Sequence, residues 1–79
     1  MSERIGIEAL QRAKEILGSQ QALARVVGVK QPSVHHMLKD GKKVPIEWCP
    51  AIERATSEMG NPVYCHELRP DFFGAGAPA

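Results

Sequence analysis

Two short amphipathic segments joined at a glycine constrain the fold of this chain more than any other feature. From Ser19 to Lys39 the apolar residues recur at intervals of three and four, as they do on the buried face of a helix. Gly28 divides the segments, and glycine takes the positive φ that ends a helix at no steric cost. Ser19 can cap the first helix, and Pro32 fits the first turn of the second. The two helices therefore meet through a tight turn, where Ala24 is small enough for close approach.

The same period in the rest of the chain predicts an all-α fold, a compact bundle of four to five short helices. In the fourth helix Pro45 starts a turn and Pro50 restarts the helix, and Pro70 ends the last turn. The predicted helices and turns cover residues 7–17, 19–27, 31–39, 45–59 and 65–68. Residues 1–73 are thus expected to form one domain, and residues 74–79, which are only glycine, alanine and proline, a disordered tail.

The predicted core is small, because a chain of 79 residues buries only about 60% of its unfolded surface. We therefore expect dimerisation to add stability. Trp48 is expected to anchor the core. The residues predicted to fill the space between the two central helices are Leu23, Val27, Val29, Val34 and Met37. Those predicted on the apolar side of the fourth helix are Ile46, Trp48, Ile52, Ala55 and Met59.

Composition excludes several classes of protein. No run approaches the roughly 20 apolar residues of a membrane span, and the first residues alternate charged with apolar side chains, unlike a signal peptide. We therefore expect a cytoplasmic protein in which Cys49 and Cys65 are reduced packing groups. Together with His66 they offer too few ligands for a closed zinc site, and no constellation supports catalysis. No metal, cofactor, membrane or small-molecule substrate is predicted.

The net charge of +1 hides an uneven distribution along the chain. Residues 1–19 are neutral, and residues 44–79 carry two arginines against five acidic residues. Residues 20–43 hold a single acidic residue, Asp40, against five basic ones, which are Arg25, Lys30, Lys39, Lys42 and Lys43. This asymmetry favours a middle segment that binds an anion. The alternative is chance unevenness, which small proteins also show.

The segment from Ser19 to Lys39 resembles the helix-turn-helix motif of the lambda-repressor and Cro type. The resemblance implies that residues 31–39 form a recognition helix for the DNA major groove. At its start, the carboxamide of Gln31 can pair with adenine N6 and N7, and Gln20 can contact a phosphate at the start of the preceding helix. The resemblance further implies that these two glutamines act together. A helix corner that never touches DNA is the structural alternative.

The DNA-binding surface predicted from this motif includes the exposed side of the second helix and the loop that follows it. For Lys42 and Lys43, a solvated loop competes nearly evenly with phosphate contact. The predicted DNA-binding residues are Gln20, Gln21, Lys30, Gln31, Pro32, Ser33, His35, His36, Lys39, Lys42 and Lys43.

Two further segments, VPIEWCPAIERAT (residues 44–56) and ELRPDFF (residues 67–73), resemble a narrower group, the YdaS/Cro-like regulators of prophages and toxin–antitoxin modules. The resemblance covers about residues 8–73. It implies an all-helical, homodimeric repressor that binds an operator near its own gene. In this group a Ser or Thr is usual at the position of Lys30. A Ser-Gln pair is usual at the positions of His35 and His36, so the chain differs from the group at both places.

A homodimer would place two recognition helices about 34 Å apart, on an inverted-repeat operator in duplex DNA. The acidic C-terminal third is the expected dimer interface, and its candidate residues are Tyr64, Leu68, Phe72 and Phe73. The alternative function, also implied by the resemblance, is an antitoxin that acts mainly by sequestering a toxin protein.

Overall fold

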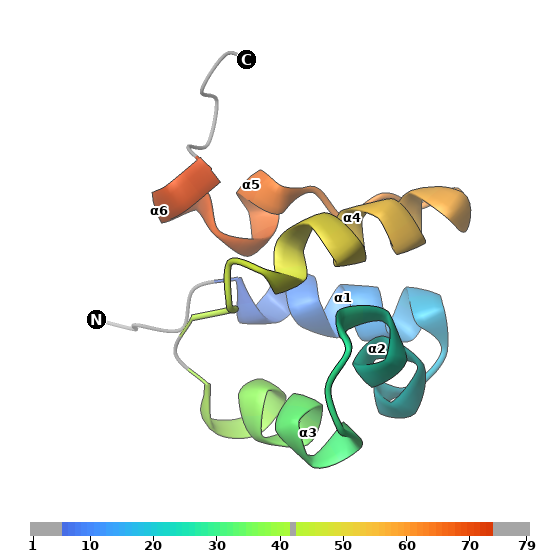
Figure 1. Ribbon diagram of the computed structural model, residues 1–79. Helices are drawn as coiled ribbons and strands as arrows, with labels where there is room; N and C mark the ends of the chain where they lie inside the picture. The colour runs from blue at the N-terminus through green and yellow to red at the C-terminus, as the bar shows by residue number, and fades with distance from the viewer. Residues whose placement is uncertain (1–5, 42, 74–79) are drawn as a thin grey trace.

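The computed structural model describes residues 6–41 and 43–73, which form helices and no extended strand (Figure 1). The helices are α1 (Ile7–Leu17), α2 (Gln20–Val27), α3 (Gln31–Asp40), α4 (Trp48–Glu58), α5 (Cys65–Leu68) and α6 (Pro70–Phe73). The predicted all-α fold is confirmed. Lys42 and the predicted tail, residues 74–79, lie outside the described residues.

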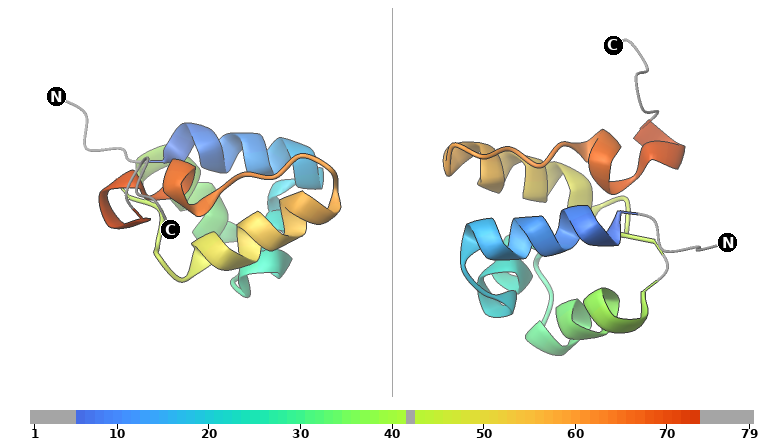
Figure 2. Two further views of the ribbon diagram at one scale, coloured as in Figure 1. Left: turned by 90° about the horizontal axis from the view of Figure 1, so that it is seen from above. Right: turned by 180° about the vertical axis from the view of Figure 1, so that it is seen from behind.

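Helix α1 is the centre of the arrangement, since it contacts α2, α3, α4 and α5. Figure 2 shows α4, α5 and α6 on one side of α1 and α3 on the other, and α2 packs against α1, α3 and α4. The exposed side of α3 therefore faces away from the C-terminal helices. The buried apolar residues of α1–α5 and of the connecting segments form one core, which includes Leu10, Leu23, Val34, Val44, Ile52, Val63 and Leu68.

The turn between α2 and α3 has the predicted local structure. The Ser19 hydroxyl accepts a hydrogen bond from the Ala22 amide at 3.1 Å and so caps α2. Gly28 ends α2 with φ 80°, and its N–H donates to the Ala24 carbonyl. Lys30 precedes α3 without a side-chain cap. These contacts fix both ends of α2, which packs against α3 and whose residue Ala24 is buried.

The predicted core is confirmed at Leu23, Val34 and Trp48, which are buried. The prediction for Met59 is wrong, since its side chain is 57% exposed. Helix α4 ends at Glu58, so Met59 lies past the last turn. The buried face of α4 consists of Trp48, Cys49, Ile52 and Thr56.

Thr56 is a buried polar residue whose hydroxyl is fully used. It donates to the Ile52 carbonyl at 2.7 Å and accepts from the Val63 amide at 2.8 Å. The loop after α4 is thereby tied back to that helix, which sets the path of the chain toward α5.

Prolines begin helical turns in the C-terminal half. Pro45 accepts a hydrogen bond from the Trp48 amide at 3.0 Å, and Pro50 lies within the first turn of the continuous helix α4. Pro70 does more than end α5, because it also begins the separate turn α6. Proline is tolerated there since the first N–H groups of a helix have no intrahelical partner.

Two carboxylates in the C-terminal helices are paired with arginines. We therefore expect the stability of the fold to decrease at acid pH. A hydrogen bond from Arg12 lowers the pKa of Glu67, and Arg69 lowers the pKa of Asp71 to about 2. A carboxylate with a lowered folded-state pKa stabilises the fold above its unfolded pKa, and this stabilisation is lost as the pH falls through the folded value. We expect Glu67→Gln to lower the melting temperature at pH 6 and to have progressively less effect toward pH 2. Thermal denaturation followed by circular dichroism measures this. A difference in melting temperature between Glu67→Gln and the wild type that stayed constant with pH would contradict this prediction. Such a constant difference is expected for the exposed Glu58→Gln control.

Candidate nucleic-acid interface

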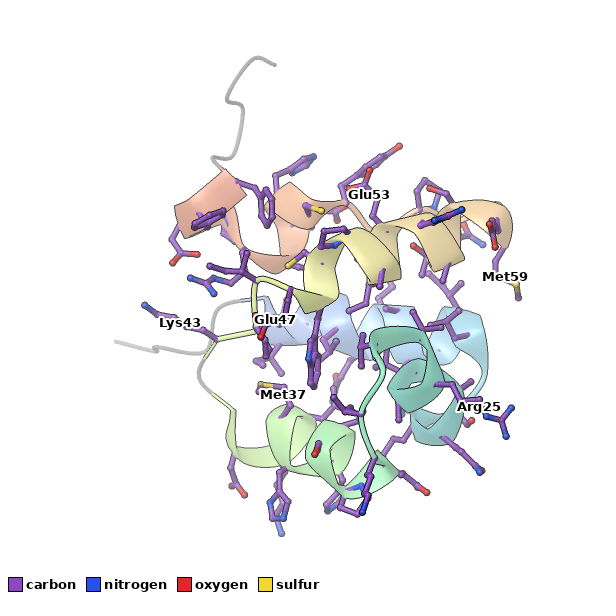
Figure 3. The ribbon with its side chains drawn as sticks, in the orientation of Figure 1. Arg25, Met37, Lys43, Glu47, Glu53 and Met59 are labelled. Carbon is purple, nitrogen blue, oxygen red and sulfur yellow. The ribbon has the colours of Figure 1, made fainter. Side chains whose placement is uncertain are left out.

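Helix α3 divides into a buried and an exposed side. Val34 and Leu38 are buried, and Met37 is half-buried and points from α3 toward the interior (Figure 3). Every other residue of α3 is exposed. Among the exposed residues are the predicted DNA contacts Gln31, Pro32, Ser33, His35, His36 and Lys39. The structure therefore brings these predicted contacts together on one solvent-facing helix.

The two glutamines of the motif lie at the starts of their helices. Gln20 is the first residue of α2 and is half-buried, whereas Gln21 and Gln31 are exposed. No hydrogen bond joins Gln20 to Gln31 within residues 6–41 and 43–73. Their joint role stays a prediction.

The exposed surface of α2 and α3 is basic. Arg25 and Lys30 are exposed, and the first acidic side chain along these two helices is Asp40, at the last position of α3. Arg25 extends outward from α2, away from the rest of the protein (Figure 3). The predicted set omitted Arg25, although it follows the predicted contact Gln21 by four residues and so shares its helix face.

The adjacent histidines of α3 lie edge to face, with ring centroids 6.1 Å apart. Both are exposed, and Nδ1 of His36 lies 4.0 Å from Oδ2 of Asp40 one turn later. Two neighbouring positions on a helix point about 100° apart. This divergence suits separate contacts with a long polyanion better than shared coordination of one ion.

The connection from α3 to α4 carries the last predicted contact. Lys43 is exposed and extends outward from this connection (Figure 3). Its Nζ lies 4.0 Å from Oδ2 of Asp71, which belongs to α6. This pairing could not be predicted from the sequence, because the two residues are far apart in the chain.

The predicted dimer-interface residues do not share one environment. Tyr64 and Phe72 are 44% and 59% exposed, as an interface would require. The prediction for Leu68 is wrong, because its side chain is fully buried in the core of the protomer. Phe73 is half-buried and packs against that core.

The two cysteines are free thiols. Burial is the main cause that raises the pKa of Cys49 to about 11 and that of Cys65 to about 12. Thiols with a raised pKa are poor nucleophiles at neutral pH. This agrees with their predicted role as packing groups.

Three comparisons relate this geometry to known proteins. A family described as "Bacterial toxin YdaS" matches residues 10–76. A relative from Escherichia coli K12, described as "Putative transcriptional regulator YdaS", is 46% identical over 63 residues. This match covers 80% of the present chain but only 61% of the relative.

The chain is also similar to a solved structure, the Cro protein from the "putative prophage element Xfaso 1" of Xylella fastidiosa strain Ann-1. The TM-score is 0.71 at 45% sequence identity, covering 85% of this chain and 97% of that one. No described helix has the length and apolar character needed to cross a bilayer. The family match spans most of the sequence and includes the segments α2–α3 and α4–α6, so the chain belongs to the YdaS family.

Proposed function

We propose that the protein is a regulator of transcription that binds duplex DNA sequence-specifically, with α3 lying in the major groove. The observation that carries this proposal is the exposed side of α3, which presents amide, hydroxyl and imidazole groups with a basic residue and keeps its apolar residues buried. Amide and imidazole groups can hydrogen-bond base edges and phosphates, and cations attract the phosphate backbone. The names of the E. coli relative and of the Xylella Cro protein support the same function. Such a regulator acts in the cytoplasm, where the bacterial chromosome lies.

The protein acts on DNA as a homodimer and a repressor in this proposal. One protomer carries few cations on α2 and α3, so a second α3 would double the phosphate and base contacts. Two recognition helices related by two-fold symmetry would read an inverted repeat in successive major grooves. The exposed side chains of Tyr64 and Phe72 are the candidate interface, and Leu68 is excluded from it by its burial.

Gln31→Ala is expected to remove about 1–3 kcal/mol of the preference for the operator, because a bidentate amide contact with adenine is worth that much. The measurement is fluorescence anisotropy on duplex DNA from just upstream of the protein's own gene, compared with a scrambled duplex at several salt concentrations. Binding to the scrambled duplex should change little, since that binding is mainly electrostatic.

Gln11→Ala is a matched control, because Gln11 is an exposed glutamine on α1. It should leave binding to both duplexes unchanged. If the wild-type protein binds both duplexes equally weakly, the basic surface is nonspecific and the proposal fails. The predicted alternative, an antitoxin that sequesters a toxin protein, would then be the next to test; the family description names a toxin and gives that alternative no specific support.

A further inference from the structure

Arg69, between α5 and α6, uses every nitrogen of its guanidinium group. Its Nε and Nη2 donate to the two carboxylate oxygens of Asp71, each at 2.8 Å. Its Nη1 donates to the main-chain carbonyl of Val44 at 3.0 Å. The Arg69 side chain is only 12% exposed and its bond to Val44 is partly buried, whereas Asp71 is 36% exposed and its bonds to Arg69 are open to solvent.

The carbonyl that Arg69 binds lies on the connection that leaves the predicted recognition helix. Val44 is fully buried, and Lys43 precedes it directly. Arg69 therefore joins the C-terminal helices to the segment between α3 and α4 at one fixed point. We call Arg69, Asp71 and the Val44 carbonyl the clamp.

Lys43 lies beside the clamp but is not hydrogen-bonded into it. Its Nζ is 4.0 Å from Oδ2 of Asp71, beyond hydrogen-bond distance. Both oxygens of that carboxylate are already taken by Arg69, which keeps Asp71 ionised by lowering its pKa to about 2. Two cations thus share one anion. The ammonium of Lys43 is attracted toward Asp71 by charge yet retains its donors for another anion, and its side chain is 54% exposed.

We propose that Arg69 is a positioning residue, which acts through the clamp to hold Lys43 as a phosphate contact of the DNA-binding surface. This proposal rests on the proposed function, because it needs α3 in the major groove. Phosphate backbones border that groove, and Lys43 lies on the segment that leaves α3. A lysine loses rotamer entropy when it binds a phosphate, and restricting it beforehand lowers that cost.

The test compares Lys43→Ala, Arg69→Lys and the double variant on a short duplex of scrambled sequence. Lys43→Ala should make the slope of log affinity against log salt less steep by about 1, the value for one phosphate contact. Arg69→Lys keeps the positive charge. A lysine, however, cannot form the bidentate pair with Asp71 and also donate to the Val44 carbonyl. We nevertheless expect Arg69→Lys to make the slope less steep, as Lys43→Ala does. The double variant should bind within about twofold of Lys43→Ala, because both substitutions remove the same contact.

Arg54→Lys is the matched control, since Arg54 is an exposed arginine on α4, and it should leave the slope unchanged. If Arg69 is only structural, Arg69→Lys lowers the melting temperature but keeps the wild-type slope, which overturns the proposal. Additive losses in the double variant, or an unchanged slope for Lys43→Ala, overturn it as well and leave the proposed function standing. If the wild-type protein binds neither the scrambled duplex nor the upstream duplex, this proposal and the proposed function are both overturned.

Asp71→Asn keeps the test decisive if Arg69→Lys fails to fold. The substitution removes a negative charge, so charge alone would tighten DNA binding and make the slope steeper. Loss of the clamp predicts a slope less steep by about 1 despite the added positive charge. A steeper slope in Asp71→Asn would overturn the proposal.

Discussion

Leu68→Ala is expected to lower the free energy of unfolding by about 2–5 kcal/mol, because the fully buried side chain leaves a cavity when it is shortened. Small domains are stable by roughly 5–15 kcal/mol, so this loss is a large fraction of the total. Urea denaturation followed by circular dichroism measures it. A loss below about 1 kcal/mol would show that Leu68 contributes little to the core.

Phe72→Ala is the matched variant in the same C-terminal segment. Its side chain is 59% exposed, so the substitution should change the stability of a protomer by no more than about 0.5 kcal/mol. In the proposed dimer it should weaken self-association, which sedimentation velocity at several protein concentrations detects. If Phe72→Ala dimerises like the wild type, Phe72 is not in the interface. Deleting the chain from Leu68 onward would not isolate the interface, because it also removes a core residue and Arg69.

The central part of the fold could be predicted from the sequence because its signals are local. Ser19 caps the helix that follows it, Gly28 adopts positive φ, and Pro32 lies at the start of its helix. Each of these preferences acts within a single turn of the chain. The exposed side of α3 followed from the helical period for the same reason, since Val34 and Leu38 fix which side faces the core.

The C-terminal segment could not be predicted as well, because periodicity carries little information in a helix of four residues. Leu68 and Phe72 are both apolar residues four positions apart, yet one is fully buried and the other exposed. The approach of Lys43 to Asp71 and the bond from Arg69 to Val44 also depend on how distant segments pack. Such contacts have no signature in one sequence.

The start of α1 packs directly against the end of α5, and this contact requires a glycine. Gly6 has φ 78°, and a Cβ added there would lie 1.9 Å from the carbonyl oxygen of Leu68. The obstacle is main chain, so it cannot be relieved by rotating a side chain. Leu68 directly precedes Arg69, so a shift of its carbonyl would also disturb the clamp.

Gly6→Ala is therefore expected to lower the free energy of unfolding by about 2–5 kcal/mol, the sum of left-handed strain and overpacking. Gly28→Ala separates the two causes, because Gly28 has φ 80° but no atom within 4 Å of the added Cβ. It should cost only about 1–2 kcal/mol, from backbone strain alone. Urea denaturation of both variants measures the difference. Equal losses of unfolding free energy in the two variants would mean that the main chain near Leu68 can shift away from the added Cβ at no energetic cost. A larger loss for Gly6→Ala would show that the contact between Gly6 and Leu68 makes the C-terminal helices part of the same cooperative core as α1.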